Sequence, residues 1–437
     1  MRILHLSSLY QPEQVGGAEL MVETLVRMQA GLGAQVGVAC LSRRAEPPDR
    51  SGAATIYRLG HGTPFYVLDW AEHGRLDRLR YKLAAQWDGR TLAAMEAAVR
   101  DFSPDVVNTH SMSELTPRIW PMLRLLGVPV VHTLHDFTSL CSNGAMVRHG
   151  RACERQHAKC RAYALLHRLC QRPVDAVVGV GSDILARHLA AGFFRDVPAA
   201  LRQVIWNPIE AGPPPAPRAL PSGGVTFGYI GRIEPSKGVD TLIEACRRLP
   251  GTGWRLRVAG RAVDGLDRYE GLAAGLPVAF DGFVAADAFL DGIDCLVVPP
   301  VWPEAFGRTV AEAYARGVPV IGTAVGGIAE QVGTDDPAWL VPPGDAAALA
   351  AAMARIVADP ARLATGLGNA AAVAEGTRPQ AVAARYLDLY RSLLAREPAV
   401  AHGSASQGST SQGSTSQGST PRESTPQGSR RHAHPAP

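Results

Sequence analysis

The chain has 437 residues, of which 46% are hydrophobic and 19% charged, and a formal net charge of +4. This length suffices for two or three domains, and the small charge excludes a strongly basic nucleic-acid-binding protein. The first apolar run is short and leads directly into Ser7 and Ser8, so no signal peptide is expected. The longest apolar helical stretch, residues 346–354, is far shorter than a membrane span. We therefore expect a cytoplasmic protein.

The chain opens with a predicted buried strand, a glycine loop and an amphipathic helix. The strand covers residues 2–7, the loop contains Gly16 and Gly17, and the helix covers about residues 20–32. Glycines leave no side chain in the way of an anion, and the N–H groups of a helix start point toward it. The pattern suits a phosphate-binding loop, although a glycine pair alone is common in ordinary loops.

A basic helical segment is predicted next, over residues 70–100. It carries five cations: Arg75, Arg78, Arg80, Lys82 and Arg90. A solvated helix face would explain them. So would a surface that meets anionic lipid or an anionic acceptor, and such a surface would make the protein peripheral to the inner face of a membrane.

Two further predicted strands end in polar residues. One covers residues 105–110 and ends in His110, and the other covers residues 128–133 and is followed by His135 and Asp136. Open α/β sheets bind ligands at the carboxyl ends of their strands, so these side chains are candidates for a site. A lone histidine is nevertheless more often structural.

Four of the seven cysteines lie within thirty residues. They are separated by eleven, six and nine residues, unlike the tight pairs of common zinc sites. Buried free thiols, a structural metal site and disulfides all stay open for these four: Cys141, Cys153, Cys160 and Cys170. The odd total argues against a full disulfide framework.

A proline- and glycine-rich segment, residues 211–224, has the composition of an interdomain linker. The strand predicted after it ends at Gly231, and Arg232 and Lys237 follow across a turn. Two cations and free N–H groups suit a diphosphate. Such cations are otherwise ordinary surface residues, and we expect both side chains to be exposed.

The stretch from Trp302 carries two glutamates, Glu304 and Glu312, with seven residues between them. A buried strand over residues 295–298 precedes it, which places Glu304 at the carboxyl end of a strand. Glu312 lies one to two turns into a helix predicted over residues 308–316. The helix dipole favours an anion at the first N–H groups, those of Arg308, Thr309 and Val310.

The run Pro-Glu-Ala-Phe-Gly-Arg-Thr from residue 303, with Gly-Val-Pro-Val-Ile-Gly from residue 317, resembles the donor-site signature of a known family. That family is the retaining glycosyltransferases of the GT-B fold, glycosyltransferase family 4 or glycosyl transferases group 1. Gly-Gly-Ala-Glu from residue 16 resembles its N-terminal loop. Asn108 departs from the pattern, since many members carry a histidine there.

The resemblance covers about residues 1–395 and implies an α/β protein with two Rossmann-like domains that face each other across a cleft. The acceptor-binding domain would span residues 1–210, with a cysteine-bearing insert at about 141–170. Residues 211–224 would be the linker and 225–395 the nucleotide-sugar-binding domain. The polar Ser-Gln-Gly-Ser-Thr repeats place residues 396–437 in a disordered tail.

The resemblance also implies roles for individual residues. Glu304 would face the transferred sugar, and Glu312 would hydrogen-bond the ribose. The implied catalytic residues are His110, Arg232, Lys237 and Glu304. The implied donor-binding residues are Gly17, Gly231, Phe306, Gly307, Thr309, Val310 and Glu312. His135 and Asp136 would line the acceptor side.

The expected reaction moves a sugar from a UDP- or GDP-sugar to a hydroxyl of a glycan, a lipid-linked molecule or a small molecule, with retention. No Asp-x-Asp occurs in the chain, which fits a metal-independent enzyme without a required cofactor. Two alternatives stay open. A sugar-nucleotide epimerase would form product without an acceptor, and a nucleotide-sugar-binding module would have lost catalysis. No nucleic-acid partner is expected.

Overall fold

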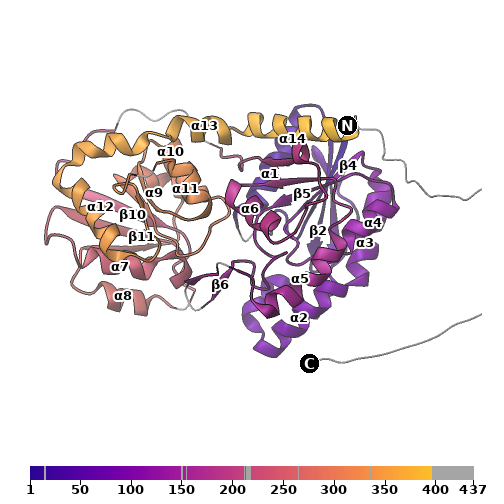
Figure 1. The fold of residues 1–437 in the computed structure, drawn as a ribbon, viewed down its shortest axis with the longest axis horizontal. Coiled ribbons are helices and arrows are strands. Elements are labelled where there is room, and N and C mark those ends of the chain that lie inside the picture. Colours follow the sequence, from indigo (N-terminus) through magenta and orange to yellow (C-terminus); the bar gives the residue numbers. More distant parts are fainter. Residues whose placement is uncertain are drawn as a thin grey trace, which may run out of the picture. The chain divides into compact units, whose positions relative to one another are not determined.

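The computed structural model describes residues 1–13, 16–148, 151–153, 155–210, 212, 218–263, 265–334 and 336–395. This part of the chain forms two parallel-sheet α/β domains (Figure 1). The predicted tail, residues 396–437, lies outside the described residues, as do residues 211 and 213–217 of the predicted linker.

The first sheet has seven parallel strands in the order β3-β2-β1-β4-β5-β8-β9. Their bounds are β1 (Arg2–Ser7), β2 (Gln35–Ser42), β3 (Ala54–Gly60), β4 (Val106–His110), β5 (Val130–Leu134), β8 (Ala176–Gly179) and β9 (Arg202–Val204). The central strands are buried along their length, as expected for a parallel sheet covered on both faces. The strand order reverses between β1 and β4, and ligands bind at such a reversal.

The second sheet has six parallel strands in the order β12-β11-β10-β13-β14-β15. They are β10 (Val225–Ile230), β11 (Trp254–Ala259), β12 (Val278–Gly282), β13 (Cys295–Val298), β14 (Val320–Thr323) and β15 (Leu340–Val341). Here the order reverses between β10 and β13. The two segments that follow these strands carry Lys237 and Glu304.

Helices cover both sheets. Those of the first domain are α1 (Gly17–Gly31), α2 (Arg75–Trp87), α3 (Gly89–Phe102), α4 (Ile119–Leu125), α5 (Ala158–Cys170) and α6 (Ser182–Ala190). Those of the second are α7 (Val239–Cys246), α8 (Asp267–Ala273), α9 (Ala286–Asp291), α10 (Arg308–Ala315), α11 (Gly326–Val332), α12 (Ala346–Ala358) and α13 (Ala370–Thr377). No helix in the described ranges is long and apolar enough to cross a membrane.

The last helix, α14 (Pro379–Leu394), returns to the first domain (Figure 1). Asn108 Nδ2 donates to the hydroxyl of Tyr390 at 2.7 Å, and Arg385 donates to the carbonyl of Val204 at 2.6 Å. The final helix therefore crosses back to the first domain. The first of these hydrogen bonds also gives Asn108 a structural role, because its side chain joins β4 to α14.

Three expectations for individual elements are wrong. The helix predicted over residues 70–100 is broken between α2 and α3, because the Asp88 side chain accepts from the N–H groups of Arg90 and Thr91 and so starts a new helix. Residues 204–209, which resemble the last strand of the family's first domain, do not form a strand beyond Val204, where β9 ends. The helix expected from about residue 20 starts at Gly17.

Candidate active site

A partly buried ion pair joins the two segments that follow β10 and β13. Lys237 Nζ contacts Glu304 Oε1, and their side chains are 17% and 21% exposed. The ammonium also lies 5.1 Å from the centre of the Trp302 ring. Lys237 is therefore not the exposed residue that we expected, because its charge is held by a carboxylate and an aromatic face.

The turn that carries Lys237 requires a glycine at the next position. Gly238 has φ of +75°, and a side chain there would collide with the Pro299 carbonyl. The turn thus packs directly on the segment after β13, which explains how Lys237 reaches Glu304. Arg232 differs: its guanidinium lies 3.2 Å from Glu234, and its side chain is 63% exposed, as expected.

The start of α10 is fixed by the loop before it. Gly307 has φ of +86° and caps the helix, and Gln331 Nε2 donates to the carbonyls of Phe306 and Gly307. The N–H of Val310 donates to the Gly307 carbonyl at 3.0 Å. We expected the N–H of Val310 to donate to an anion, but it donates to the loop instead. The N–H groups of Arg308 and Thr309, the first two of the helix, can still donate to an anion.

The side chain of Arg308 was missed by sequence reasoning, which used only its backbone. Its Nε donates to Glu312 Oε1 at 2.6 Å, the geometry that an Arg and a Glu four residues apart on a helix permit. Burial raises the pKa of Glu312, and Arg308 acts against that rise. A Cβ on Gly17 would lie 3.5 Å from Arg308 Cδ, so the glycine loop of the first domain faces this pair.

Two buried nitrogens beside these charges have no hydrogen-bond partner within the described part of the chain. They are Arg308 Nη1 and Trp302 Nε1. Buried donors are usually paired, so these two nitrogens are available to a ligand or a water molecule. Both belong to the segment from Trp302 to Glu312, where the sequence predicts that the sugar donor binds.

Three histidines form a hydrogen-bonded chain in the first domain. His110 Nε2 lies 2.9 Å from His5 Nδ1, and His110 Nδ1 lies 3.0 Å from His135 Nε2. The outer nitrogen of His5 lies 2.9 Å from Gln29 Oε1, which can only accept. Burial lowers the pKa of His5 and His135 to about 4 and holds that of His110 well below its ordinary value, so all three rings are neutral at pH 7.

This chain changes what His110 can do. Its side chain is 0% exposed, and both ring nitrogens are bonded to other histidines. In this arrangement it presents no nitrogen to a sugar, and His135 is the outer end of the chain. Asp136, beside it, accepts from the N–H of Thr138 at 2.7 Å, and burial raises the pKa of its carboxyl.

A contact between the domains that the sequence did not indicate involves Glu330 of α11. Its carboxylate accepts from Ser182 N and Oγ at 2.7 and 2.8 Å and from Trp206 Nε1 at 2.7 Å. Nearby, a Cβ on Gly181 would lie 2.6 Å from the Ala305 carbonyl. The segments after β8 and β13 therefore touch. No hydrogen bond or ion pair among the described residues joins the histidine chain to Lys237 or Glu304.

The cysteines are free thiols in this structure, with Cys141, Cys160 and Cys170 buried and Cys153 half-buried. No group of three or more His, Cys, Asp or Glu side chains in the described ranges could hold a metal ion. Neither the metal nor the disulfide alternative for the four is supported, whereas buried free thiols describe three of them.

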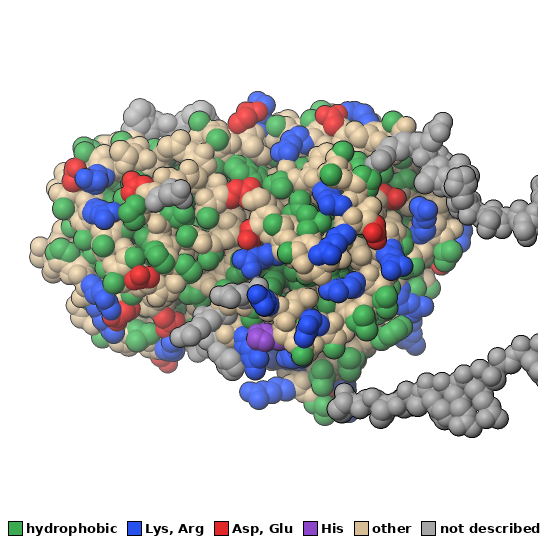
Figure 2. All heavy atoms as spheres, viewed as in Figure 1, with side chains coloured by type: hydrophobic (Ala, Val, Ile, Leu, Met, Phe, Trp, Pro, Cys, Tyr) green, Lys and Arg blue, Asp and Glu red, His purple; other side chains and the backbone are tan. Residues whose placement is uncertain are grey.

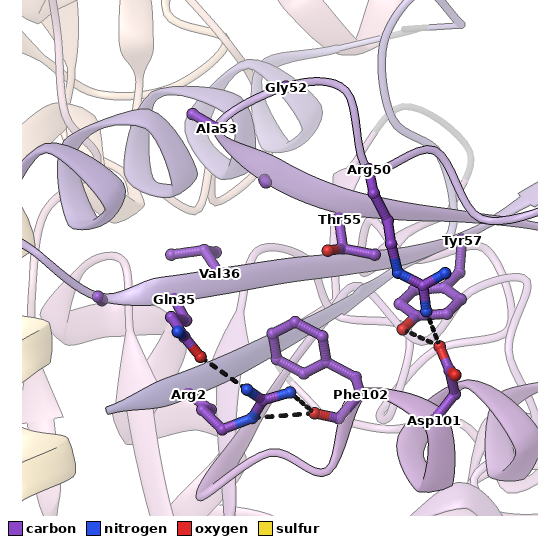
Figure 3. Close-up of a pocket in the computed structure, with 12 residues that line it drawn as sticks. Arg2, Gln35, Val36, Arg50, Gly52, Ala53, Thr55, Tyr57, Asp101 and Phe102 are labelled. Carbon is purple, nitrogen blue, oxygen red and sulfur yellow. Dashed lines mark hydrogen bonds and ion pairs between the residues drawn. The ribbon is translucent and has the colours of Figure 1, made fainter.

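A cavity of about 270 Å³ lies away from these residues (Figure 3). It is lined by Arg2, Gln35, Ala54, Asp101 and neighbouring residues. Arg2, Gln35 and Ala54 begin β1, β2 and β3, so the cavity lies at the edge opposite the carboxyl ends. It is not part of the candidate site.

Two family models match the chain. The model described as "Glycosyl transferase 4-like domain" matches residues 16–207, and "Glycosyl transferases group 1" matches residues 215–373. The first range contains the histidine chain except His5. The second contains Arg232, Lys237, Glu304 and Glu312.

Curated relatives match over most of the chain. The 2-deoxystreptamine N-acetyl-D-glucosaminyltransferase of Streptomyces fradiae is 31% identical over 318 residues, 66% of this chain and 72% of that protein. An uncharacterized 42.6 kDa protein in the cps region of Klebsiella pneumoniae is 26% identical over 332 residues, 76% of this chain and 87% of that one.

Solved structures share the fold. Sucrose-phosphate synthase of Thermosynechococcus elongatus has a TM-score of 0.67 at 23% identity, and the match covers 90% of this chain and 99% of the synthase chain. HepE of Anabaena, in complex with UDP and glucose, has a TM-score of 0.63 at 20% identity and covers 90% of this chain and 100% of its own. At these identities the likeness concerns the fold alone.

Proposed function

We propose a specific reaction for this chain, which belongs to the GT-B glycosyltransferases. The reaction is transfer of a sugar from a nucleotide diphosphate sugar to an acceptor hydroxyl, with retention and without a metal ion. As a member of that family it is a transferase that uses a nucleotide sugar. The donor would bind the domain of residues 225–395 and the acceptor the domain of residues 1–210, joined by the linker of residues 211–224.

The observation that carries the proposal is the Lys237–Glu304 ion pair beside the start of α10. A partly buried cation next to free helix-start N–H groups is a site for an anion. A bound diphosphate would take over Lys237 and free the carboxylate of Glu304 for the sugar. Arg232, which is exposed, could turn toward the same phosphates.

Charge stabilisation is the chemistry that these groups would supply. When the bond between sugar and phosphate breaks, negative charge grows on the leaving diphosphate. Lys237, Arg232 and the first N–H groups of α10 would stabilise that charge more strongly than they stabilise the bound donor. Protein cations would thus do the work that a divalent ion does elsewhere, in agreement with the lack of an Asp-x-Asp sequence.

The rest of the donor would lie along the segment from Trp302 to Glu312. The sugar would meet Glu304, and the ribose would meet Glu312 and the unpaired nitrogen of Arg308. Backbone groups and small residues would line the path of the diphosphate and sugar: Gly17, Gly231, Phe306, Gly307 and Thr309. Val310 would contribute packing only, because its N–H is used within the loop.

The acceptor would approach His135 and Asp136. We assign His110 to positioning: its hydrogen bonds to His5 and His135 fix the ring orientation and tautomer of His135. Retention would proceed on one face of the sugar. The carboxylate placed nearest the sugar, Glu304, is held by Lys237 and is not assigned as a nucleophile. The leaving phosphate would then take the proton of the acceptor hydroxyl.

A donor panel tests the proposal. UDP, GDP and their glucose conjugates would be compared by thermal shift, with UDP-glucose first because the fold neighbour HepE was solved with UDP and glucose. Transfer would then be measured with glycan and lipid-linked acceptors in the presence of EDTA, and NMR would give the anomeric configuration of the product. Inversion, or loss of activity in EDTA, would contradict the proposal.

One control separates the alternatives. A sugar-nucleotide epimerase would convert its substrate without any acceptor, whereas the proposed enzyme would release free nucleoside diphosphate only slowly under that condition. Binding of a nucleotide sugar without turnover under every acceptor would instead support a binding module.

A further inference from the structure

Two helices of the first domain expose large apolar side chains to solvent. On α2, Leu76, Leu79, Leu83 and Trp87 are 61%, 54%, 59% and 63% exposed. These positions recur every three or four residues and so form one stripe along the helix. The opposite side of α2 buries Tyr81 and Ala85. On α5, Leu165 and Leu169 are 56% and 59% exposed. We name this set of six residues and the helices that carry them the α2–α5 face.

The two helices lie side by side. Gln86 Nε2 lies 3.1 Å from the Tyr163 hydroxyl and 3.2 Å from His167 Nε2, so the C-terminal part of α2 contacts α5. Figure 1 shows α2 and α5 next to each other, and Figure 2 shows hydrophobic side chains over them with Lys and Arg around. Contiguous exposed apolar surface of this kind marks a binding surface.

The charged side chains of α2 and α5 are almost all positive. The helices contain seven cations and one carboxylate, Asp77; the cations are Arg75, Arg78, Arg80, Lys82, Lys159, Arg161 and Arg168. These two helices therefore carry +6, whereas the whole chain carries only +4. The complementary surface must be apolar and negatively charged at once. A second copy of the same face would bring two such clusters of cations together and be repelled.

An anionic lipid bilayer has both properties. Amphipathic helices with Lys and Arg on the polar side and Leu and Trp on the other bind at the interface between headgroups and acyl chains. Trp side chains are enriched at that depth. We propose that the α2–α5 face docks this protein on membranes that contain anionic lipid, with the leucines and Trp87 inserted and the exposed cations Arg75, Arg80, Lys159 and Arg161 among the headgroups.

The docking face is tied to the proposed acceptor side. Lys82 Nζ donates to the Ser142 carbonyl and lies 3.3 Å from Asn143 Oδ1, in the segment that follows His135 and Asp136. Docking would hold that segment near the membrane, where a lipid-linked acceptor would be. This consequence rests on the proposed function, whereas the docking itself does not.

Vesicle co-sedimentation of the full chain tests the docking. Vesicles of phosphatidylcholine would be compared with vesicles that also contain phosphatidylglycerol. We expect binding only to the anionic vesicles, weakening as salt is added. Two triple variants should each bind the anionic vesicles about tenfold or more weakly: Leu76→Ser, Leu79→Ser, Leu83→Ser and Arg75→Gln, Arg80→Gln, Arg161→Gln. Each cation, and each leucine that inserts into the membrane, contributes to the affinity.

Matched controls come from other exposed residues. Leu32→Ser, Leu125→Ser, Leu220→Ser removes three leucines that are 49%, 88% and 59% exposed elsewhere, and Arg44→Gln, Arg255→Gln, Arg355→Gln removes three exposed cations. Both controls should bind vesicles like the unaltered chain. Equal loss in the controls would overturn the proposal, as would equal binding to neutral vesicles or none to either.

Two further measurements keep the outcome specific. Light scattering would reveal self-association; a dimer that the leucine variant disrupts, without vesicle binding, would show that a second copy covers the face and overturn the membrane proposal. Thermal shift with UDP should be unchanged in every variant. Failure of nucleotide binding in the unaltered chain would concern the proposed function and leave the vesicle result standing.

Discussion

At the scale of single residues, the candidate site depends on how Lys237 is held. Its ammonium contacts both the Glu304 carboxylate and the Trp302 ring, so its charge is compensated in this structure. Arg232, nearby in sequence, is exposed and is paired with Glu234. The two cations therefore differ in their surroundings, although the sequence presents them alike.

Replacing either cation should impair catalysis. We expect Lys237→Ala and Arg232→Ala each to reduce kcat/KM by on the order of 10²-fold, if each contributes like a donor of an oxyanion hole. Steady-state kinetics with the identified donor would measure this, with Arg255→Ala, an exposed residue of the same domain, as the control. Near-normal turnover in either variant would remove that residue from the assignment.

The two glutamates should separate in their kinetic effects. Glu312 is assigned to the ribose, which does not react, so Glu312→Gln should mainly raise the KM for the donor. Glu304 is assigned to the sugar, whose charge changes during the reaction, so Glu304→Gln should mainly lower kcat. Both changes preserve size. The reverse pattern would mean that the donor lies across this segment in the opposite direction.

At the scale of elements, Glu330 links α11 to the first domain through Ser182 and Trp206. Hydrogen bonds to a charged group are worth more than neutral ones, so Glu330→Gln should lower the free energy of unfolding by about 2 kcal/mol. Denaturant unfolding, followed by tryptophan fluorescence, would report it. Glu375→Gln is the control, because the Glu375 side chain is 67% exposed and pairs with Arg378, three residues later in the chain. Equal stability of the two variants would deny Glu330 this role.

At the scale of the whole molecule, buried histidines make stability depend on pH. Burial lowers the pKa of His5, His135, His167 and His188 to about 4 and that of His132 to about 3. Between pH 6.5 and 4 the unfolded chain binds protons that the folded chain does not. Stability should therefore be full above pH 6.5 and fall as the pH drops to 4.

A single variant isolates one of these protons. His188→Asn keeps a donor for the Ile184 carbonyl and removes the titrating ring. The slope of unfolding free energy against pH in this window should then decrease by about 1.4 kcal/mol per pH unit at most. The comparison with the unaltered chain matters because buried carboxyls with raised pKa, such as Glu114 and Asp136, act with the opposite sign. An unchanged slope would contradict the assignment.

The sequence by itself determined the fold and indicated most of the residues proposed for the site. The two-domain α/β GT-B fold is confirmed, and β1, β10 and β13 lie where the apolar runs predicted them. Parallel strands that are buried on both faces are continuous apolar runs, and glycine turns mark the ends of several of them. Glu304, Lys237 and Gly307 could be found because each is close in sequence to such a strand end.

Only the tertiary structure decided which side chains meet. The His5–His110–His135 chain joins strands more than 100 residues apart, and the Glu330 contacts with Ser182 and Trp206 join residues more than 120 apart. No local pattern encodes such distances. The same reason explains why our expectations for Lys237 and His110 were wrong. Lys237 is paired because Glu304 follows the neighbouring strand of the sheet. His110 is enclosed because His5 on β1 and His135 after β5 lie on either side of it.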